Sequence, residues 1–149
     1  MYSKYVFSGH ESFSCRMLWP IKGYDYINDG NSFNDPNSVI MLGVGKNMVA
    51  SIRYWLKALG LTEHDKPSTL AKYLFDEAQG KDRYLESLGT LWLLHFLLVV
   101  LNEATLYNIL FLRYQKERKQ FAKEQVLNFV KRLMAEDDRL KQFNSNTVG

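Results

Sequence analysis

Apolar residues recur at helical spacing along most of this chain, and polar, glycine or proline residues separate the repeats. Val49, Ile52, Leu56 and Leu59 follow one another at intervals of three or four residues, which places them on one face of a helix over 46–59. Similar spacing predicts further helices at about 14–27, 36–42, 69–75, 88–101, 104–114 and 123–135. The chain is therefore expected to be mainly α-helical.

Local signals mark a short helix and a turn before the helix at 46–59. Asp35 can accept hydrogen bonds from free amides at a helix start, and Pro36 at the first helical position loses no hydrogen bond. Gly43 then permits a tight turn that other residues resist. A short helix, a turn with glycine and a second helix follow in the order of a helix-turn-helix over 38–58.

The face of the second helix opposite its apolar stripe carries side chains suited to DNA. Asn47 and Ser51 are short hydrogen-bonding residues that suit base edges, and the small Ala50 allows close approach to the major groove. The basic residues on this face are expected to meet phosphates. The predicted DNA-binding set is Lys46, Asn47, Ala50, Ser51, Arg53, Tyr54 and Lys57.

The segments on either side of a glycine-containing break predict two regions. The polar, turn-prone residues 61–68 follow the second helix and resemble the exit into a wing, the hairpin of a winged helix-turn-helix. Ser68, the last of them, is expected to cap the helix over 69–75. Ala78-Gln-Gly-Lys-Asp82 is the clearest internal break. We therefore expect a winged helix-turn-helix-like, DNA-binding region over 1–78, packed with a helical region over 79–149.

Composition and charge agree with this prediction and narrow the classes of protein. The 149 residues are 46% hydrophobic and 14% aromatic, which is enough for a real core, and a net charge of +3 agrees with a nucleic-acid partner without establishing one. Lone Cys15 excludes an internal disulfide. The longest apolar run, Leu91 to Leu101, spans only about 16 Å as a helix, against about 30 Å of hydrocarbon. We expect a buried helix, no membrane partner and a cytoplasmic protein.

Two further groups of residues are weaker candidates. The basic run at 113–119 could touch phosphates as a secondary contact through Arg113, Lys116, Arg118 and Lys119, although such runs are usually solvated and Glu117 dilutes this one. His10 and Glu11, beside Gly9, could supply a general base or half of a metal site. A structural role for both is favoured, because two adjacent residues do not make a site.

No metal site or cofactor is predicted from spacing alone. Glu11 with Asp25, Asp29 and Asp35 could hold magnesium, since hard cations prefer carboxylate oxygens, but their spacing is not diagnostic. Gly43-Val-Gly45-Lys46 lacks the spacing of a phosphate-binding loop and follows no long strand. A nucleotide-hydrolysis site is therefore rejected, and the turn explains the glycines.

Four motifs together carry a resemblance to a known family. They are Phe7-Ser-Gly-His-Glu-Ser-Phe13, Leu42-Gly-Val-Gly-Lys-Asn-Met-Val49, Ser51-Ile-Arg-Tyr-Trp55 and Leu91-Trp-Leu-Leu-His95. The chain resembles a bacterial family long catalogued as a domain of unknown function, whose members occur in defence-associated gene clusters for DNA phosphorothioate modification. The similar protein there is a DNA-nicking component that works with a cysteine desulfurase and sulfur-transfer partners.

The resemblance implies a role in sulfur modification of the DNA backbone, with DNA and other proteins of the modification complex as partners. It implies no catalytic motif that transfers residue by residue. Family members tend to be longer, so the resemblance also implies an amino-terminal part of a longer protein.

Three hypotheses follow and stay open at this point. The first is a DNA-recognition module of a phosphorothioation system. The second is a nickase that needs Mg²⁺ or Mn²⁺, with His10 and Glu11 as the best candidates for catalysis. The third is a protein-interaction scaffold, because two amphipathic helices joined by a glycine turn also occur in ordinary helical bundles.

Overall fold

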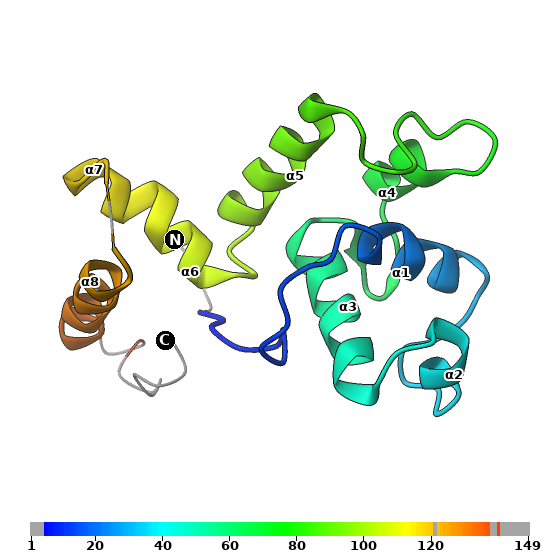
Figure 1. Cartoon of the computed structure of the whole chain (residues 1–149), viewed down its shortest axis with the longest axis horizontal. Helices are drawn as coiled ribbons and strands as arrows, with labels where there is room; N and C mark the ends of the chain where they lie inside the picture. Colours follow the sequence, from blue (N-terminus) through cyan, green and yellow to red (C-terminus); the bar gives the residue numbers. More distant parts are fainter. Residues whose placement is uncertain (1–4, 121, 138–139, 141–149) are drawn as a thin grey trace. The chain divides into compact units, whose positions relative to one another are not determined.

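The structure is a computed structural model that describes residues 5–120, 122–137 and 140 of the chain. The described residues are mostly helical, with one two-stranded antiparallel sheet, so the prediction of a mainly α fold is confirmed (Figure 1). The elements are α1 (Trp19–Asn28), α2 (Ser38–Leu42), α3 (Lys46–Ala58), β1 (Thr62–Glu63), β2 (Lys66–Pro67), α4 (Thr69–Phe75), α5 (Leu88–Val100), α6 (Thr105–Asn108), the π-helix η1 (Ile109–Tyr114), α7 (Gln115–Glu117) and α8 (Lys123–Glu136).

The chain divides into two compact units, and the division differs from the sequence boundary expected near residue 78. One unit is residues 9–97, and the other joins residues 1–8 to residues 98–149. In the second unit, the Val6 amide donates to Thr105 Oγ1 at 2.7 Å, and the Thr105 amide donates to the Val6 carbonyl at 2.9 Å. Residues at the amino terminus therefore belong with the carboxy-terminal helices.

Aromatic side chains from the amino-terminal segment complete the core of the unit formed by residues 1–8 and 98–149. Tyr5 and Phe7 are buried there with Ile109 of η1 and Phe129 of α8. The Phe129 and Tyr114 rings meet edge to face with centroids 5.1 Å apart, an arrangement that aromatic quadrupoles favour. Residues 5–8 belong to neither a helix nor a strand, so this segment joins the core as an arm.

In the unit of residues 9–97, α1 packs closely against α3. Gly23 on α1 faces α3, and a Cβ atom at Gly23 would lie 2.5 Å from Leu56 Cδ1 and 2.8 Å from Ile52 Cγ2. Ile52 and Leu56 are almost completely buried. The missing side chain at Gly23 therefore sets the distance between the two helices.

The end of α2 and the start of α4 follow the signals in the sequence, whereas the start of α2 is shifted. Asp35 Oδ1 accepts from the Asn37 amide at 2.8 Å, and α2 begins two residues later than expected. Gly43 has φ +61°, the left-handed conformation that a turn at the end of α2 requires. Ser68 Oγ accepts from the Ala71 amide at 3.1 Å, so the predicted cap of α4 is confirmed.

Helix α5 is only partly buried, which corrects the expectation that its apolar run is a core helix. Leu94 is 4% exposed, whereas Trp92 is 66% and Phe96 is 60% exposed. The run is apolar on all sides, so its sequence period could not distinguish a buried face from an exposed one. Each helix in the described part of the chain, taken singly, falls short of the length or the apolar character that a membrane crossing needs.

A Gly23→Ala substitution is expected to destabilise the protein, because the added methyl group overlaps two buried side chains of α3. The expected loss in the free energy of unfolding is about 1–3 kcal/mol, measured by urea denaturation. Gly89→Ala in α5 is the control, since the nearest atom to its new Cβ is 3.6 Å away. Equal unfolding midpoints for the two variants would contradict the close packing of α1 on α3.

Candidate nucleic-acid interface

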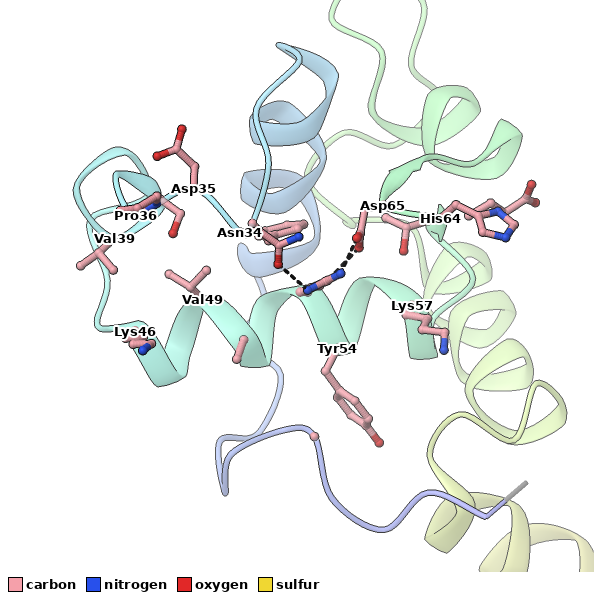
Figure 2. Close-up of a pocket in the computed structure, with 17 residues that line it drawn as sticks. Asn34, Asp35, Pro36, Val39, Lys46, Val49, Tyr54, Lys57, His64 and Asp65 are labelled. Atoms are coloured by element: carbon pink, nitrogen blue, oxygen red, sulfur yellow. Dashed lines mark hydrogen bonds and ion pairs between the residues drawn. The ribbon is translucent and has the colours of Figure 1, made fainter. Parts of the chain in front are cut away.

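An open groove of about 1220 Å³ lies along α3 within the unit of residues 9–97. Its floor is one face of α3, and its walls come from residues 33–39, before and within α2, and from hairpin residues 62–65. Figure 2 shows Lys46 and Lys57 at opposite ends of α3, with Asp35, Pro36 and Val39 near one end and His64 near the other. The turn into α2 and the hairpin after α3 thus flank the helix that the sequence predicted to meet DNA.

Most of the predicted DNA-facing residues gather in this groove. The predicted residues that line it are Lys46, Ala50, Arg53, Tyr54 and Lys57. Asn47 is exposed on the first turn of α3, just outside the lining. This grouping follows from helical spacing, because positions three or four residues apart share one face.

Ser51 does not face the groove, which corrects its place in the predicted set. The residue is fully buried, and its hydroxyl makes no hydrogen bond among the described residues. The segment before α1 lies on this side of α3, where the Trp55 indole donates to the Phe13 carbonyl at 2.9 Å. A side chain that a helical wheel places at the edge of the outer face is therefore covered, and it cannot reach a base edge in this conformation.

Arg53 connects α3 to both walls of the groove. Its Nε donates to Asp65 Oδ1 at 2.8 Å, and its Nη2 donates to Asp65 Oδ2 at 2.5 Å. Its Nη1 donates to Asn34 Oδ1 at 3.1 Å. The hydrogen bonds that Arg53 donates to the Asp65 carboxylate raise the pKa of Arg53 above its usual value, so the guanidinium keeps its charge.

Asn34 and Asp65 are partners at this site that helical spacing does not reveal. Asn34 comes directly before the helix-start signal at Asp35 and Pro36, and Asp65 lies in the polar segment 61–68. In the structure, Asp65 is the second residue of the hairpin turn, with φ +59°, a conformation that Asp tolerates better than most residues. The turn-prone His64-Asp65 pair was the one local signal for a two-residue hairpin loop.

Charges of both signs line the groove. In the described part of the chain, its lining has the basic side chains of Lys46, Arg53 and Lys57 and the carboxylates of Asp35, Glu63 and Asp65. Asp65 is paired with Arg53, so the two lysines supply the positive charge at the ends of the helix. The groove is therefore not uniformly basic.

His10 and Glu11 lie in a tight loop beside α3. The His10 ring contacts the rings of Tyr54 and Trp55, with centroids 5.8 and 6.1 Å apart, and a Cβ at Gly9 would lie 2.7 Å from Tyr54 Cδ2. Glu11 is exposed and has φ +48°. The described residues contain no group of three or more His, Cys, Asp or Glu side chains that could hold a metal ion.

The second basic candidate lies in the other unit, at the end of the helix 105–117. Lys116, Arg118 and Lys119 are exposed, and Arg113 is half-buried. Glu117 accepts two hydrogen bonds from Arg132 Nη2, at 2.8 and 3.0 Å. This carboxylate is therefore partly neutralised by Arg132, and it dilutes the basic run less than the sequence suggested.

Comparisons with known proteins connect the chain to one family and one solved protein. The model for "Protein of unknown function (DUF4007)" matches residues 7–149. The magnesium ion-bound SspB crystal structure matches with a TM-score of 0.57 and 38% identity, over 63% of this chain and 31% of that chain. A second SspB crystal structure matches with a TM-score of 0.57 and 40% identity, over 62% and 31%. No curated protein matches the chain significantly.

Ser51→Ala and Ser68→Ala are expected to change the free energy of unfolding in opposite directions. Ser51→Ala removes a buried hydroxyl that has no hydrogen-bond partner among the described residues, so the free energy of unfolding is expected to rise by roughly 1 kcal/mol. Ser68→Ala removes the cap of α4 and should lower it by about 1 kcal/mol. Thermal and urea unfolding measure both. A loss at Ser51 as large as that at Ser68 would mean that the Ser51 hydroxyl is satisfied and that its burial serves another purpose.

Proposed function

The chain belongs to the DUF4007 family, and on this premise we propose that it is a DNA-recognition module of a bacterial DNA phosphorothioation system. The four sequence motifs and the similarity to SspB support this setting. The chain spans about a third of the length of the SspB chains that it matches. Its partners would be DNA and the other proteins of the modification complex.

The observation that carries the proposal is the outward face of α3. Lys46 and Lys57 stand at the two ends of this helix, about 16 Å apart along its axis at 1.5 Å per residue. The major groove is about 12 Å wide and admits an α-helix. A helix docked there would bring the two lysines near phosphates on both sides, while Asn47 and the small Ala50 face the bases.

The hairpin after α3 supports a winged helix-turn-helix interpretation. Strands β1 and β2 pair Thr62 with Pro67 and Glu63 with Lys66, directly after the helix that would enter the groove. In winged proteins of this order, the hairpin lies beside the recognition helix, and the two contact adjacent stretches of DNA. Lys66 is exposed on this hairpin and adds a positive charge at that place.

The basic residues of the other unit would act as secondary phosphate contacts. Lys116 lies in the last turn of α7, Arg118 and Lys119 follow the end of this helix, and all three are exposed, long and flexible cations suited to phosphates rather than to base edges. We expect them to contribute to affinity for any duplex rather than to the choice of sequence.

Salt titration tests the proposal. Affinity for a fluorescein-labelled mixed-sequence duplex should fall steeply as salt rises, because DNA binding releases counterions. Lys46→Gln and Lys57→Gln should each weaken binding and lower the slope of log affinity against log salt by about 0.9. Fluorescence anisotropy measures both quantities.

Lys72→Gln is the matched control, because Lys72 is exposed on α4 and does not line the groove. Its slope should equal that of the unmodified protein. If the affinity for the duplex changes neither with salt nor with any of the three substitutions, the DNA-recognition proposal is refuted and the protein-interaction scaffold is favoured.

A nickase is the second candidate, and the observation that favours it is the magnesium ion in the similar SspB structure. On the recognition proposal, the 149-residue chain binds DNA without cutting it, so it leaves supercoiled plasmid intact in Mg²⁺ or Mn²⁺. Agarose gels that resolve nicked circles provide the measurement. Nicked circles that disappear with Glu11→Gln, but persist with the neighbouring Ser12→Ala, would assign the cut to this chain and to Glu11.

A further inference from the structure

The Arg53 side chain hydrogen-bonds to the hairpin and to the turn before α2 at once. Two of its nitrogens bind the Asp65 carboxylate, and the third binds the Asn34 side chain. Figure 2 shows Asn34 and Asp65 on the same side of α3, with Tyr54 on the opposite side. The guanidinium therefore joins three segments that surround the groove.

The guanidinium nitrogens of Arg53 bind acceptors within the protein and are not directed at an approaching phosphate. An arginine that meets DNA usually presents two adjacent nitrogens to a phosphate or to a guanine edge. Here the edge formed by Nε and Nη2 already binds both oxygens of Asp65, and Nη1 binds Asn34. A phosphate that met the Nε–Nη2 edge would have to displace a bidentate carboxylate.

The pair is partly open to solvent, which limits what it does for folding. The Arg53 and Asp65 side chains are 43% and 39% exposed. Exposed ion pairs contribute little to global stability, because water and salt compete with them. A planar bidentate pair nevertheless fixes the orientation of the two side chains relative to each other. This matters for the hairpin, because its strands are joined by only two residue pairs.

We propose that Arg53 is a positioning residue, which holds the hairpin against α3 through Asp65 and so sets the width of the groove that receives DNA. This inference rests on the proposed function for its binding readout only. It replaces the earlier assignment of Arg53 as a phosphate contact. The hairpin then reaches DNA already oriented, so binding loses less conformational entropy.

The sign of the effect at Asp65 separates this proposal from a phosphate contact. Asp65→Asn removes a negative charge beside DNA, which by charge alone tightens binding. If Asp65 holds the hairpin through Arg53, the same substitution weakens binding. The experiment compares Arg53→Gln, Asp65→Asn and the double variant with the unmodified 149-residue chain, on the same fluorescein-labelled duplex across a salt series.

We expect each single substitution to weaken binding about two- to fivefold, and the double variant to be no weaker than either single one. The salt slope should stay unchanged in all three variants. Tighter or unchanged binding by Asp65→Asn, together with a slope lowered by about 0.9 in Arg53→Gln, would overturn the proposal and restore Arg53 as a phosphate contact.

Arg53→Lys is the conservative control. Lysine keeps the charge but cannot bind both carboxylate oxygens in a planar fork. On the positioning proposal it weakens binding as much as Arg53→Gln does. Binding equal to that of the unmodified chain would mean that charge alone matters, and this result would also overturn the proposal.

Hydrogen exchange gives a readout that does not depend on DNA. The Ser68 amide donates to the Leu61 carbonyl at 3.0 Å and closes the base of the hairpin. Exchange at residues 62–68 should accelerate to the same extent in Arg53→Gln and Asp65→Asn, while α1 stays unchanged. If exchange at these residues is unchanged in both variants, the positioning role of Arg53 is refuted, even if the chain binds DNA. If exchange accelerates but the unmodified chain binds no DNA, only the proposed function is refuted.

Discussion

The contact between α1 and α3 at Gly23 decides which side of α3 can meet a partner. With no side chain at Gly23, Ile52 and Leu56 reach the surface of α1 and become buried. Burying two branched aliphatic side chains contributes about 1.5–3 kcal/mol each, so this face is fixed firmly. The residues on the other side of the helix, Lys46 and Lys57 among them, are thereby directed outward.

Two further segments narrow the outward face of α3 from its flanks. On one flank, Ser51 is buried, and Gly9 in the segment before α1 lies directly against the Tyr54 ring. On the other flank, Arg53 joins the hairpin through Asp65. An amphipathic helix that would otherwise expose a broad polar surface therefore presents only a strip, and a narrow strip suits insertion into a groove better than contact with a flat partner.

The acidic side chains in the groove affect how a duplex could approach. Asp35 lies near the Lys46 end of α3, and Glu63 belongs to the hairpin, next to His64 near the Lys57 end. On the proposed function, a phosphate that approaches either end of the helix would therefore meet a carboxylate as well as a lysine. Mixed charge of this kind affects the choice and orientation of a partner more than affinity.

The sequence by itself determined the features that depend on near neighbours. Helical spacing predicted α3 to within one residue, and the side chain of Ser68 predicted the start of α4. The outward placement of Lys46, Ala50 and Lys57 followed from the same spacing. These features were predictable because the interactions that fix them lie within a few residues along the chain.

Tertiary structure alone decided the features that depend on distant residues. Val6 hydrogen-bonds to Thr105, and this contact across the length of the chain moved the amino-terminal segment into the other unit. Ser51 lost its place in the candidate site because it is buried in the folded chain, and Arg53 took Asp65 as its partner because a hairpin folds back beside α3. The spacing of apolar residues and the charges along one helix carry no information about which segments pack against its edges. These features therefore became known only from the tertiary structure.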